Sequence, residues 1–407
     1  MDLAFFTNFS ASLTAQESEL NTLQEEISSG VAVQTPEENP SAFETALIGD
    51  DQISALNGDT TSVGDIQGQL GDVSNAYTSV LSEVSNVQQL VLGALNGTTS
   101  GQNMQSLATQ VNAAEQQMLG IANTTGSNGT FLFGGTRGTV QPFQVQPDGS
   151  VVYMGDGGQS QAAISSDLSA STIATGEAFI SGLQGDGTAS VTAATTNTGT
   201  GVLLSEGVGN PAAASAFQQG NEPITVSFSN NAAGAVIFTA TQTSAAGVTS
   251  TVATGPATSG TSLTLGGVDF QLTGTPAAGD SFTVAPSRPQ TVFNLLNNIS
   301  TTLQGSDNSP AQAAVTRQNL NQDLSALAQY QQTFTTAQAQ TGVTLQSLTN
   351  TSTSNSTQET EVQNNVDNAI STNFPATLTA LDQNTTAVEA AMKAFSTVQS
   401  LSLFSVI

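Results

Sequence analysis

The feature that most constrains this chain is a run of apolar residues spaced seven apart in its first quarter. The first row is Leu56, Val63, Leu70, Tyr77, Val84 and Val91. A second row, offset by three residues, is Ile66, Val73, Val80, Val87 and Ala94. Alternating three- and four-residue steps place both rows on one face of an α-helix, as in a coiled coil. The pattern predicts a helix roughly 60 Å long, at 1.5 Å per residue.

A helix of this length needs partners that cover its apolar face. After a glycine-rich break at 96–101, a shorter helix is predicted from Met104, Leu107, Val111, Met118 and Ile121. A long partner is predicted from Leu320, Leu324, Leu327, Phe334, Leu345 and Leu348. Asn308-Ser309-Pro310 is a plausible start for it, with proline in the first turn. The apolar pattern is lost over residues 350–357.

Both ends of the chain carry weaker repeats of the same kind. The residues at these positions are Phe6, Leu13, Leu20, Ile27, Phe374, Leu378, Leu381, Val388, Met392 and Phe395. Pro375 marks the start of the last helix, because the residue before proline disfavours a continuing helix. The residues alone leave two alternatives open. These helices either close an intramolecular bundle or form a seam that neighbouring subunits complete.

The middle of the chain, 146–290, has the alternating pattern of β-strands. Residues 224–228 alternate apolar and polar side chains, as does the segment around Phe282 and Val284. Gly266-Gly267 separates two such runs and is a two-residue hairpin signal. The sequence therefore predicts an α+β multidomain chain. Long-helix coiled-coil arms from the two ends pack together, and a mainly-β outer domain is inserted between them.

Composition excludes several classes of function. The 407 residues contain four Lys and Arg against 31 Asp and Glu, which gives a net charge of −27. So few cations cannot form the basic surface that nucleic acids or anionic membranes require. With no Cys and no His, disulfides, thiolate metal sites and the commonest general base are absent. MDLAFFTNFS lacks the features of a cleaved signal peptide, and no stretch is long and apolar enough to span a membrane.

No catalytic, cofactor or metal site is predicted. The acidic pairs Glu25-Glu26, Glu37-Glu38 and Asp50-Asp51 are interpreted as solvated surface charge, since adjacent helical residues point in different directions. Asp148-Gly149 and Asp156-Gly157 are interpreted as turns rather than calcium ligands, because their spacing is unlike a calcium loop. A serine nucleophile would lack a base. We therefore expect a protein that is not an enzyme.

Several motifs together resemble the flagellin-like family of flagellar hook-associated protein 3. The segment 131–143 resembles that family's F-G-G…P-F hairpin through Phe131, Phe133, Gly134, Gly135, Pro142 and Phe143. The segment 28–40 resembles the start that the family shares with flagellin, and 153–158 its entry into the outer domain. The segment 274–284 is similar to one common in hook-associated proteins, and 390–403, ending near Leu403, resembles the closing helix.

The resemblance implies a three-part organisation. Residues 1–44 and 356–407 would form a terminal coiled-coil layer that orders on assembly, with Leu403 among its interface residues. Residues 45–145 and 291–355 would form a long-helix bundle with the hairpin, and 146–290 the outer domain.

It also implies a structural role in the bacterial flagellum, at the junction between hook-associated protein 1 and the flagellin filament. The partners would be further copies of itself, hook-associated protein 1, flagellin and an export chaperone. The chain would be secreted by type III export without a cleaved signal.

Two features depart from this family. Val31, Ala32 and Gln34 stand where relatives usually have a basic residue, and Asn373-Phe374-Pro375 replaces an acidic pair. Flagellin itself is the nearest alternative, although the F-G-G…P-F segment argues against it. A calcium- or glycan-binding adhesin is a more distant alternative. It would need clusters of ligand residues in 146–290, and the sequence offers none there.

Overall fold

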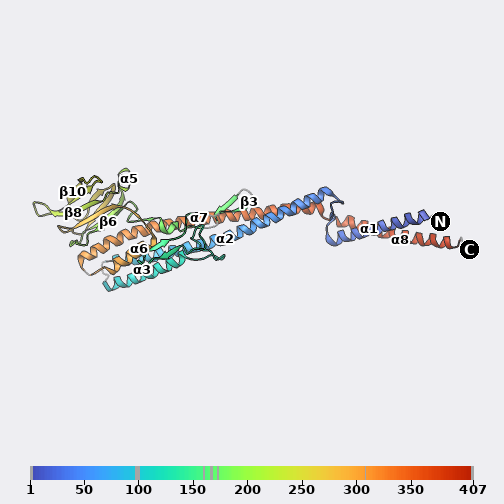
Figure 1. The fold of residues 1–407 in the computed structure, drawn as a ribbon, viewed down its shortest axis with the longest axis horizontal. Helices are drawn as coiled ribbons and strands as arrows, with labels where there is room; N and C mark the ends of the chain where they lie inside the picture. The colour runs from blue at the N-terminus through green and yellow to red at the C-terminus, as the bar shows by residue number, and fades with distance from the viewer. Residues whose placement is uncertain are drawn as a thin grey trace. The chain divides into compact units, whose positions relative to one another are not determined.

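The computed structural model forms two units, which are described separately (Figure 1). Unit 1 comprises 1–63 and 350–407, and unit 2 comprises 64–349. The helices α2 (Pro40–Leu95) and α7 (Pro310–Ile370) contribute to both. The predicted boundaries of the three-part organisation stay a prediction. The structure describes residues 3–96, 101–158, 161–165, 168–171, 174–307 and 309–404.

In unit 1 the first and last helices, α1 (Leu3–Ser29) and α8 (Phe374–Phe404), form an antiparallel pair. Near the start of α1, the rings of Phe9 and Phe395 stack with centroids 4.6 Å apart. Near its end, the Thr372 hydroxyl donates to the Glu26 carbonyl at 3.1 Å. The side chain of Asn373 caps α8, because its Oδ1 accepts from the Ala376 amide at 3.3 Å. The predicted packing of the two terminal arms is thus confirmed.

The long coiled-coil face predicted for α2 is a core. Apart from Leu56, which is half-buried, every residue of the two predicted rows is buried. In unit 2, α2 shares one apolar cluster with α3 (Gly101–Ala122), α6 (Val292–Gln304) and α7. Leu320, Leu327 and Phe334 of α7 are each 0% exposed within it. The long helix therefore has three helical neighbours.

The helix α7 extends beyond the region where its apolar pattern is lost. It runs without a break from Pro310 to Ile370, so the loss of pattern over 350–357 does not end the helix. The hydroxyl of Thr357 donates to the Thr353 carbonyl at 2.9 Å, which satisfies this polar group within the helix itself. At the other end, Ser309 Oγ accepts from the Gln312 amide at 3.2 Å and caps the helix, with Pro310 in its first turn. Asn308 lies outside the described residues.

The hairpin predicted over 131–143 is displaced. Residues 131–142 form successive turns, and the paired strands are β1 (Phe143–Val145) and β2 (Val151–Tyr153). The glycines explain the difference. Gly135 adopts φ +62°, where an added Cβ would collide with the Asp156 carbonyl, so this segment folds back on itself instead of extending.

The inserted region is a pair of antiparallel sheets around a second apolar cluster. One sheet has five strands in the order β10-β9-β8-β13-β6, and the other has three in the order β11-β12-β7. Gly266-Gly267 joins β11 to β12 as predicted, with Leu265 opposite Val268. The helix α5 (Pro211–Gly220) contributes Phe217 to the same cluster.

The remaining bounds are short. The strands of the two sheets are β6 (Ala189–Ala193), β7 (Val202–Val208), β8 (Ile224–Asn230), β9 (Val236–Thr243), β10 (Thr249–Pro256), β11 (Thr261–Leu265), β12 (Val268–Thr273) and β13 (Ser281–Pro286). Outside them lie β3 (Gln161–Ser165), β4 (Leu168–Ser171), α4 (Glu177–Ile180), β5 (Gly182–Leu183) and β14 (Pro289–Gln290).

Two glutamines of α7 bind the edges of the two sheets. Gln318, which is 0% exposed, accepts from the Leu203 amide of β7 at 2.7 Å and donates to the Leu203 carbonyl at 2.8 Å. One helical turn later, Gln322 does the same for Val191 of β6, accepting from its amide at 2.5 Å and donating to its carbonyl. Each side-chain amide therefore takes the place of a neighbouring strand.

Candidate assembly interface

The terminal helices leave an apolar row open to solvent. Phe6, Phe374, Leu378 and Met392 are 50%, 46%, 52% and 48% exposed. A paired helix normally buries such side chains, at about 25 cal/mol per Å² of apolar surface. In this pair the row has no covering element within the described residues of unit 1.

The other predicted interface positions face the partner helix to different degrees. Val388 is buried, and the half-buried residues are Leu13, Leu20, Ile27, Leu381 and Phe395. The ring of Phe395 also lies 5.7 Å from that of Phe6. Leu403 belongs to α8, but its side chain lies outside the described part of the structure. The structure thus brings most of the predicted residues to one helix pair, where some are buried or half-buried and others are about half exposed.

Sequence reasoning missed a second exposed apolar site in unit 1. Leu47 and Ile48 of α2 are 56% and 50% exposed. They directly precede Gly49, where α2 approaches α7 so closely that an added Cβ would collide with the Val366 side chain. The sequence did contain a signal for this site. Two adjacent apolar residues cannot both belong to one row of residues spaced seven apart, so at least one of Leu47 and Ile48 had to lie outside the helix seam.

The residues of the F-G-G…P-F motif anchor the helical core rather than presenting a binding surface. Phe133 and Phe143 are 0% and 1% exposed. Their ring centroids lie 5.1 Å and 5.2 Å from that of Phe179, which itself lies 5.0 Å from Phe334 of α7. Phe131 is half-buried, and Gly134, Gly135 and Pro142 are buried. The motif therefore holds the turn segment against α7 through an aromatic cluster.

The carboxylates of this segment are turn residues, as the sequence indicated. Asp156 accepts from the amides of Thr136 and Gly158 at 2.8 Å and 3.1 Å and lies 3.9 Å from Arg137 Nε. The hydrogen bonds from Thr136 hold the pKa of the Asp156 carboxyl below its usual value. Those from Ser150 lower the pKa of Asp148 in the same way. Among the described residues, no three acidic side chains gather as metal ligands would.

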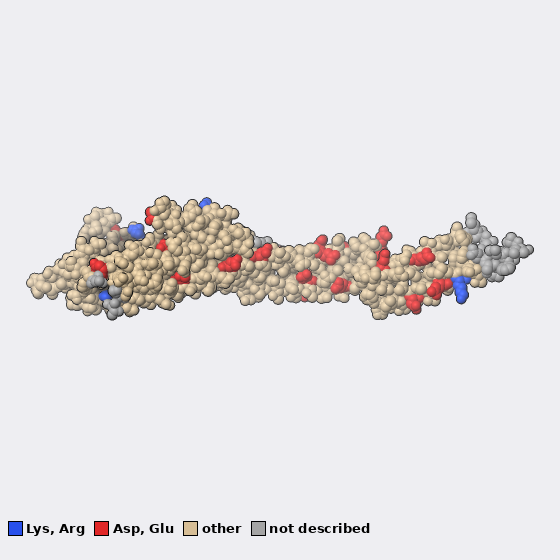
Figure 2. Space-filling view, turned by 90° about the horizontal axis from the view of Figure 1, so that it is seen from below, with Lys and Arg blue, Asp and Glu red and all other residues tan. Residues whose placement is uncertain are grey.

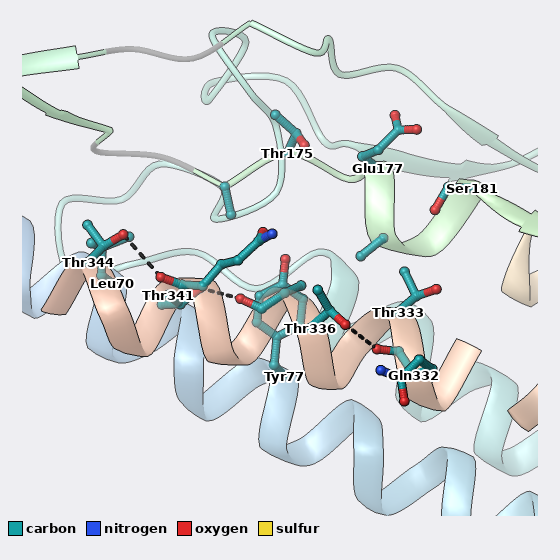
Figure 3. A pocket seen from close by; sticks show the side chains of 14 residues that line it. Leu70, Tyr77, Thr175, Glu177, Ser181, Gln332, Thr333, Thr336, Thr341 and Thr344 are labelled. Carbon is teal, nitrogen blue, oxygen red and sulfur yellow. Dashed lines mark hydrogen bonds between the residues drawn. The ribbon is translucent and has the colours of Figure 1, made fainter. Parts of the chain in front are cut away.

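A groove lies beside this segment on unit 2 (Figure 3). Its volume is about 540 Å³, with Leu70 and Tyr77 of α2 at its floor and residues 174–181 on one side. The other side is α7, from Gln332 to Thr344. Burial raises the pKa of Tyr77 to about 12, so its phenol stays neutral. The groove holds a single charged side chain, Glu177, and no pair of groups suited to acid–base catalysis.

Comparison with known proteins shows that the chain is similar to proteins of the bacterial flagellum. The family described as the bacterial flagellin N-terminal helical region matches residues 3–137. Flagellar hook-associated protein 3 of Escherichia coli K12 is 30% identical over 132 residues, which are 32% of this chain and 41% of that protein. The protein of the same name from Salmonella typhimurium LT2 is 28% identical over 132 residues. The chain thus spans about two-fifths of the length of the curated relatives it matches.

Solved structures extend the likeness to most of the chain. FlgL of Xanthomonas campestris, in space group H3, is 25% identical with a TM-score of 0.64, covering 73% of this chain and 94% of that one. The first third of the chain is thus similar in sequence to flagellar hook-associated protein 3, and most of the chain shares the fold of FlgL. The flagellar junction protein FlgL of Legionella pneumophila shares the fold at a TM-score of 0.71 and 22% identity, covering 80% of this chain and 100% of that one. No described helix is long and apolar enough to cross a membrane.

Proposed function

We propose that this chain is a structural subunit of the bacterial flagellum, in the layer between hook-associated protein 1 and the flagellin filament. Its neighbours would be further copies of itself, hook-associated protein 1 below and flagellin above. One observation carries the proposal. In the pair α1/α8, the side chains of Phe6, Leu378 and Met392 are about half exposed. Exposed apolar side chains of this kind are typical of a surface that other subunits cover in an assembly. The names of the relatives supply the location.

In this proposal residues 1–44 and 356–407 form the inner layer, and they order fully only when neighbours cover the open row. A subunit with one kind of contact on each side assembles head-to-tail into a ring or a helix. Export through the flagellar type III channel with the help of a chaperone, and without a cleaved signal, belongs to the same proposal. The absence of Cys accords with a chain that travels unfolded, because no disulfide must form or break.

Deletion of the gene in the bacterium that carries it tests the location. We expect complete hooks, no filaments, and flagellin released into the medium. Expression of the intact gene from a plasmid is the control and should restore filaments. Normal filaments in the deletion strain would contradict the proposal.

Flagellin is the alternative function. One observation favours it, because residues 3–137 match the family named for the N-terminal helical region of bacterial flagellin. Immunogold labelling of assembled flagella separates the two. A junction subunit is labelled at one short zone next to the hook, whereas a filament subunit is labelled along the whole length.

Limited proteolysis of the purified chain tests the inner layer. We expect mild protease to remove about 40 residues from each end of the monomer while unit 2 survives, because short helices without full partners open easily. Full protection of both ends would instead favour a closed intramolecular bundle.

A further inference from the structure

A polar hollow of about 480 Å³ lies on unit 2, between α6, α7 and the strand β6. It shares no lining residue with the groove of Figure 3. The helix α7 contributes Gln312, Asn319 and Asp323, whose spacings of seven and four place them on one helical face. The helix α6 contributes Asn298 and Thr302, which are four apart and share a face in the same way. We call this space the α6/α7 hollow.

Asp323 is the single charged residue that lines the α6/α7 hollow. Its Oδ2 is buried and has no hydrogen-bond partner among the described residues. Burial is the one cause of the raised pKa of this carboxyl, so no neighbouring charge or hydrogen-bond donor offsets the cost of ionising it. Buried polar groups in folded proteins almost always have a partner, and a bound ligand can supply it here.

The charged groups on neighbouring segments do not reach this carboxyl. The elements α6, β5, β6 and β14 contain no charged residue. Asp186, in the turn after β5, accepts from two backbone amides of its own turn. Arg288, just before β14, donates to Asn221 Oδ1 at 3.0 Å, and Arg317 of α7 is exposed. The described chain therefore leaves Asp323 without a counter-ion.

Neutral amides with free hydrogen-bonding groups surround the carboxyl. The side chains of Asn298, Gln312 and Asn319 line the hollow and have no hydrogen-bond partner among the described residues. Each side-chain amide offers a carbonyl oxygen that accepts and an NH₂ group that donates. A ligand hydroxyl matches either group, because it can donate to the first and accept from the second.

The charge of the whole chain favours a cationic ligand. Four Lys and Arg stand against 31 Asp and Glu. Figure 2 shows acidic side chains scattered over the surface, with few basic ones among them. A chain of this charge produces a negative potential that concentrates small cations around it.

We propose that the α6/α7 hollow binds a small hydroxylated amine. Its ammonium group pairs with the Asp323 carboxylate, and its hydroxyls form hydrogen bonds with the amides of Asn298 and Asn319. The volume of the hollow lies within the range of small-molecule sites. A divalent metal ion is a poorer match, because such ions take several oxygen ligands with more than one carboxylate, and the hollow has one. A neutral sugar satisfies the amides but leaves the carboxyl without a counter-ion.

Titration calorimetry of the purified full chain in phosphate buffer tests the site. The probe is glucamine, which carries one ammonium group and several hydroxyls, and sorbitol is its neutral counterpart. We expect glucamine to bind at least about tenfold more tightly than sorbitol, because it forms a charge-assisted pair with the carboxylate. The affinity for glucamine should rise about tenfold from pH 6 to pH 7, since binding ionises a carboxyl whose pKa is raised.

Three variants assign the binding to this hollow. Asp323→Asn keeps the shape of the side chain and should remove both the preference for glucamine and its pH dependence. Asp307→Asn, in the exposed loop between α6 and α7, is the matched control and should leave glucamine binding unchanged. Asn319→Leu should weaken the binding of both compounds. Circular dichroism and the melting temperature show that each variant is folded.

Several outcomes would overturn the inference. They are a folded wild-type chain that does not bind glucamine, equal binding of glucamine and sorbitol, and full glucamine binding by Asp323→Asn. Binding of calcium in preference to glucamine would overturn the class of ligand. The inference does not depend on the proposed function, so each of these results leaves the junction role to be decided by gene deletion.

Discussion

The terminal pair α1/α8 and the helical core of unit 2 are built from the same seven-residue spacing, yet they end in different states. In the core, the row positions Val80, Val84, Val87 and Val91 of α2 are each 0% exposed. In the terminal pair, Leu378 and Met392 at equivalent positions are about half exposed. The difference shows that spacing predicts which face of a helix is apolar, but not how many neighbours cover that face.

The number of neighbours explains the contrast. In unit 2, α3, α6, α7 and the aromatic turn segment surround α2, so an apolar side chain meets partners on several sides. In unit 1, α1 and α8 meet each other along one side. A two-helix contact buries a narrow seam, and any apolar residue beside that seam stays in water.

The largest expected effect compares one leucine from each region. Leu327→Ala removes a side chain that is 0% exposed and should lower the free energy of unfolding by about 2–5 kcal/mol, since a cavity remains. Leu378→Ala removes one that is 52% exposed and should change it by less than about 0.5 kcal/mol. Urea unfolding followed by circular dichroism measures both. An equal loss of unfolding free energy in the two variants would contradict the difference between the covered core and the open terminal pair.

A second test concerns a defect inside the core region. Burial raises the pKa of the Asp323 carboxyl to about 8, and its buried Oδ2 has no hydrogen-bond partner among the described residues. The folded chain keeps this proton while the unfolded chain releases it near the usual value of 3.8. The wild-type chain should therefore lose stability as pH rises from about 4 to 8, by about 1.4 kcal/mol for each unit of pKa difference actually present.

Asp323→Asn removes this titration. Its melting temperature relative to the wild type should rise steadily between pH 5 and pH 8, measured by calorimetry. The exposed Asp307 gives the control, because Asp307→Asn changes a carboxyl whose pKa the Ser309 hydrogen bonds lower rather than raise. A wild-type curve parallel to that of Asp323→Asn would contradict the assignment.

A third test probes the hydrogen bonds that join the core to the two segments on either side of the sheet region, β5 and β14. The buried Tyr330 hydroxyl accepts from the Gly182 amide at 3.2 Å and donates to the Gln290 carbonyl at 2.5 Å. Tyr330→Phe leaves both groups unpaired and should cost about 1–3 kcal/mol. Thermal unfolding measures the loss. Phe334→Leu, which changes an equally buried ring without such bonds, separates packing from hydrogen bonding.

The smallest effect belongs to the terminal pair. Phe395→Leu keeps an apolar side chain but removes the stacked contact with Phe9, worth about 0.5–1.5 kcal/mol in aromatic pairs. The loss should appear as faster proteolysis of the ends, with the melting temperature of unit 2 unchanged. A fall in that melting temperature would show that the two regions unfold together and would remove the basis of the comparison.

Periodic apolar residues were the part of the fold that sequence could predict. The rows of α2, the strand at 224–230 and the Gly266-Gly267 turn follow from local spacing alone. The continuation of α7 through 350–357 did not, because serine and threonine hydroxyls that bond within the helix leave no apolar signal. The turns over 131–142 depend on contacts with Asp156, and the same motif was therefore mistaken for paired strands.

The candidate interface was predictable in part for the same reason. The positions in α1 and α8 were found from spacing, but which of them are covered depends on the helix opposite.

The two glutamines of α7 that bind β6 and β7 also set an order of events for the growing chain. The Leu203 amide can form its hydrogen bond only with Gln318, 115 residues later in the chain. The Val191 amide likewise needs Gln322, 131 residues later. Until α7 arrives, both strand edges have unpaired amides that a foreign strand could join. The inserted domain is therefore open to mispairing with other strands for as long as α7 is missing, and it reaches its final form only after the chain that follows it has been made.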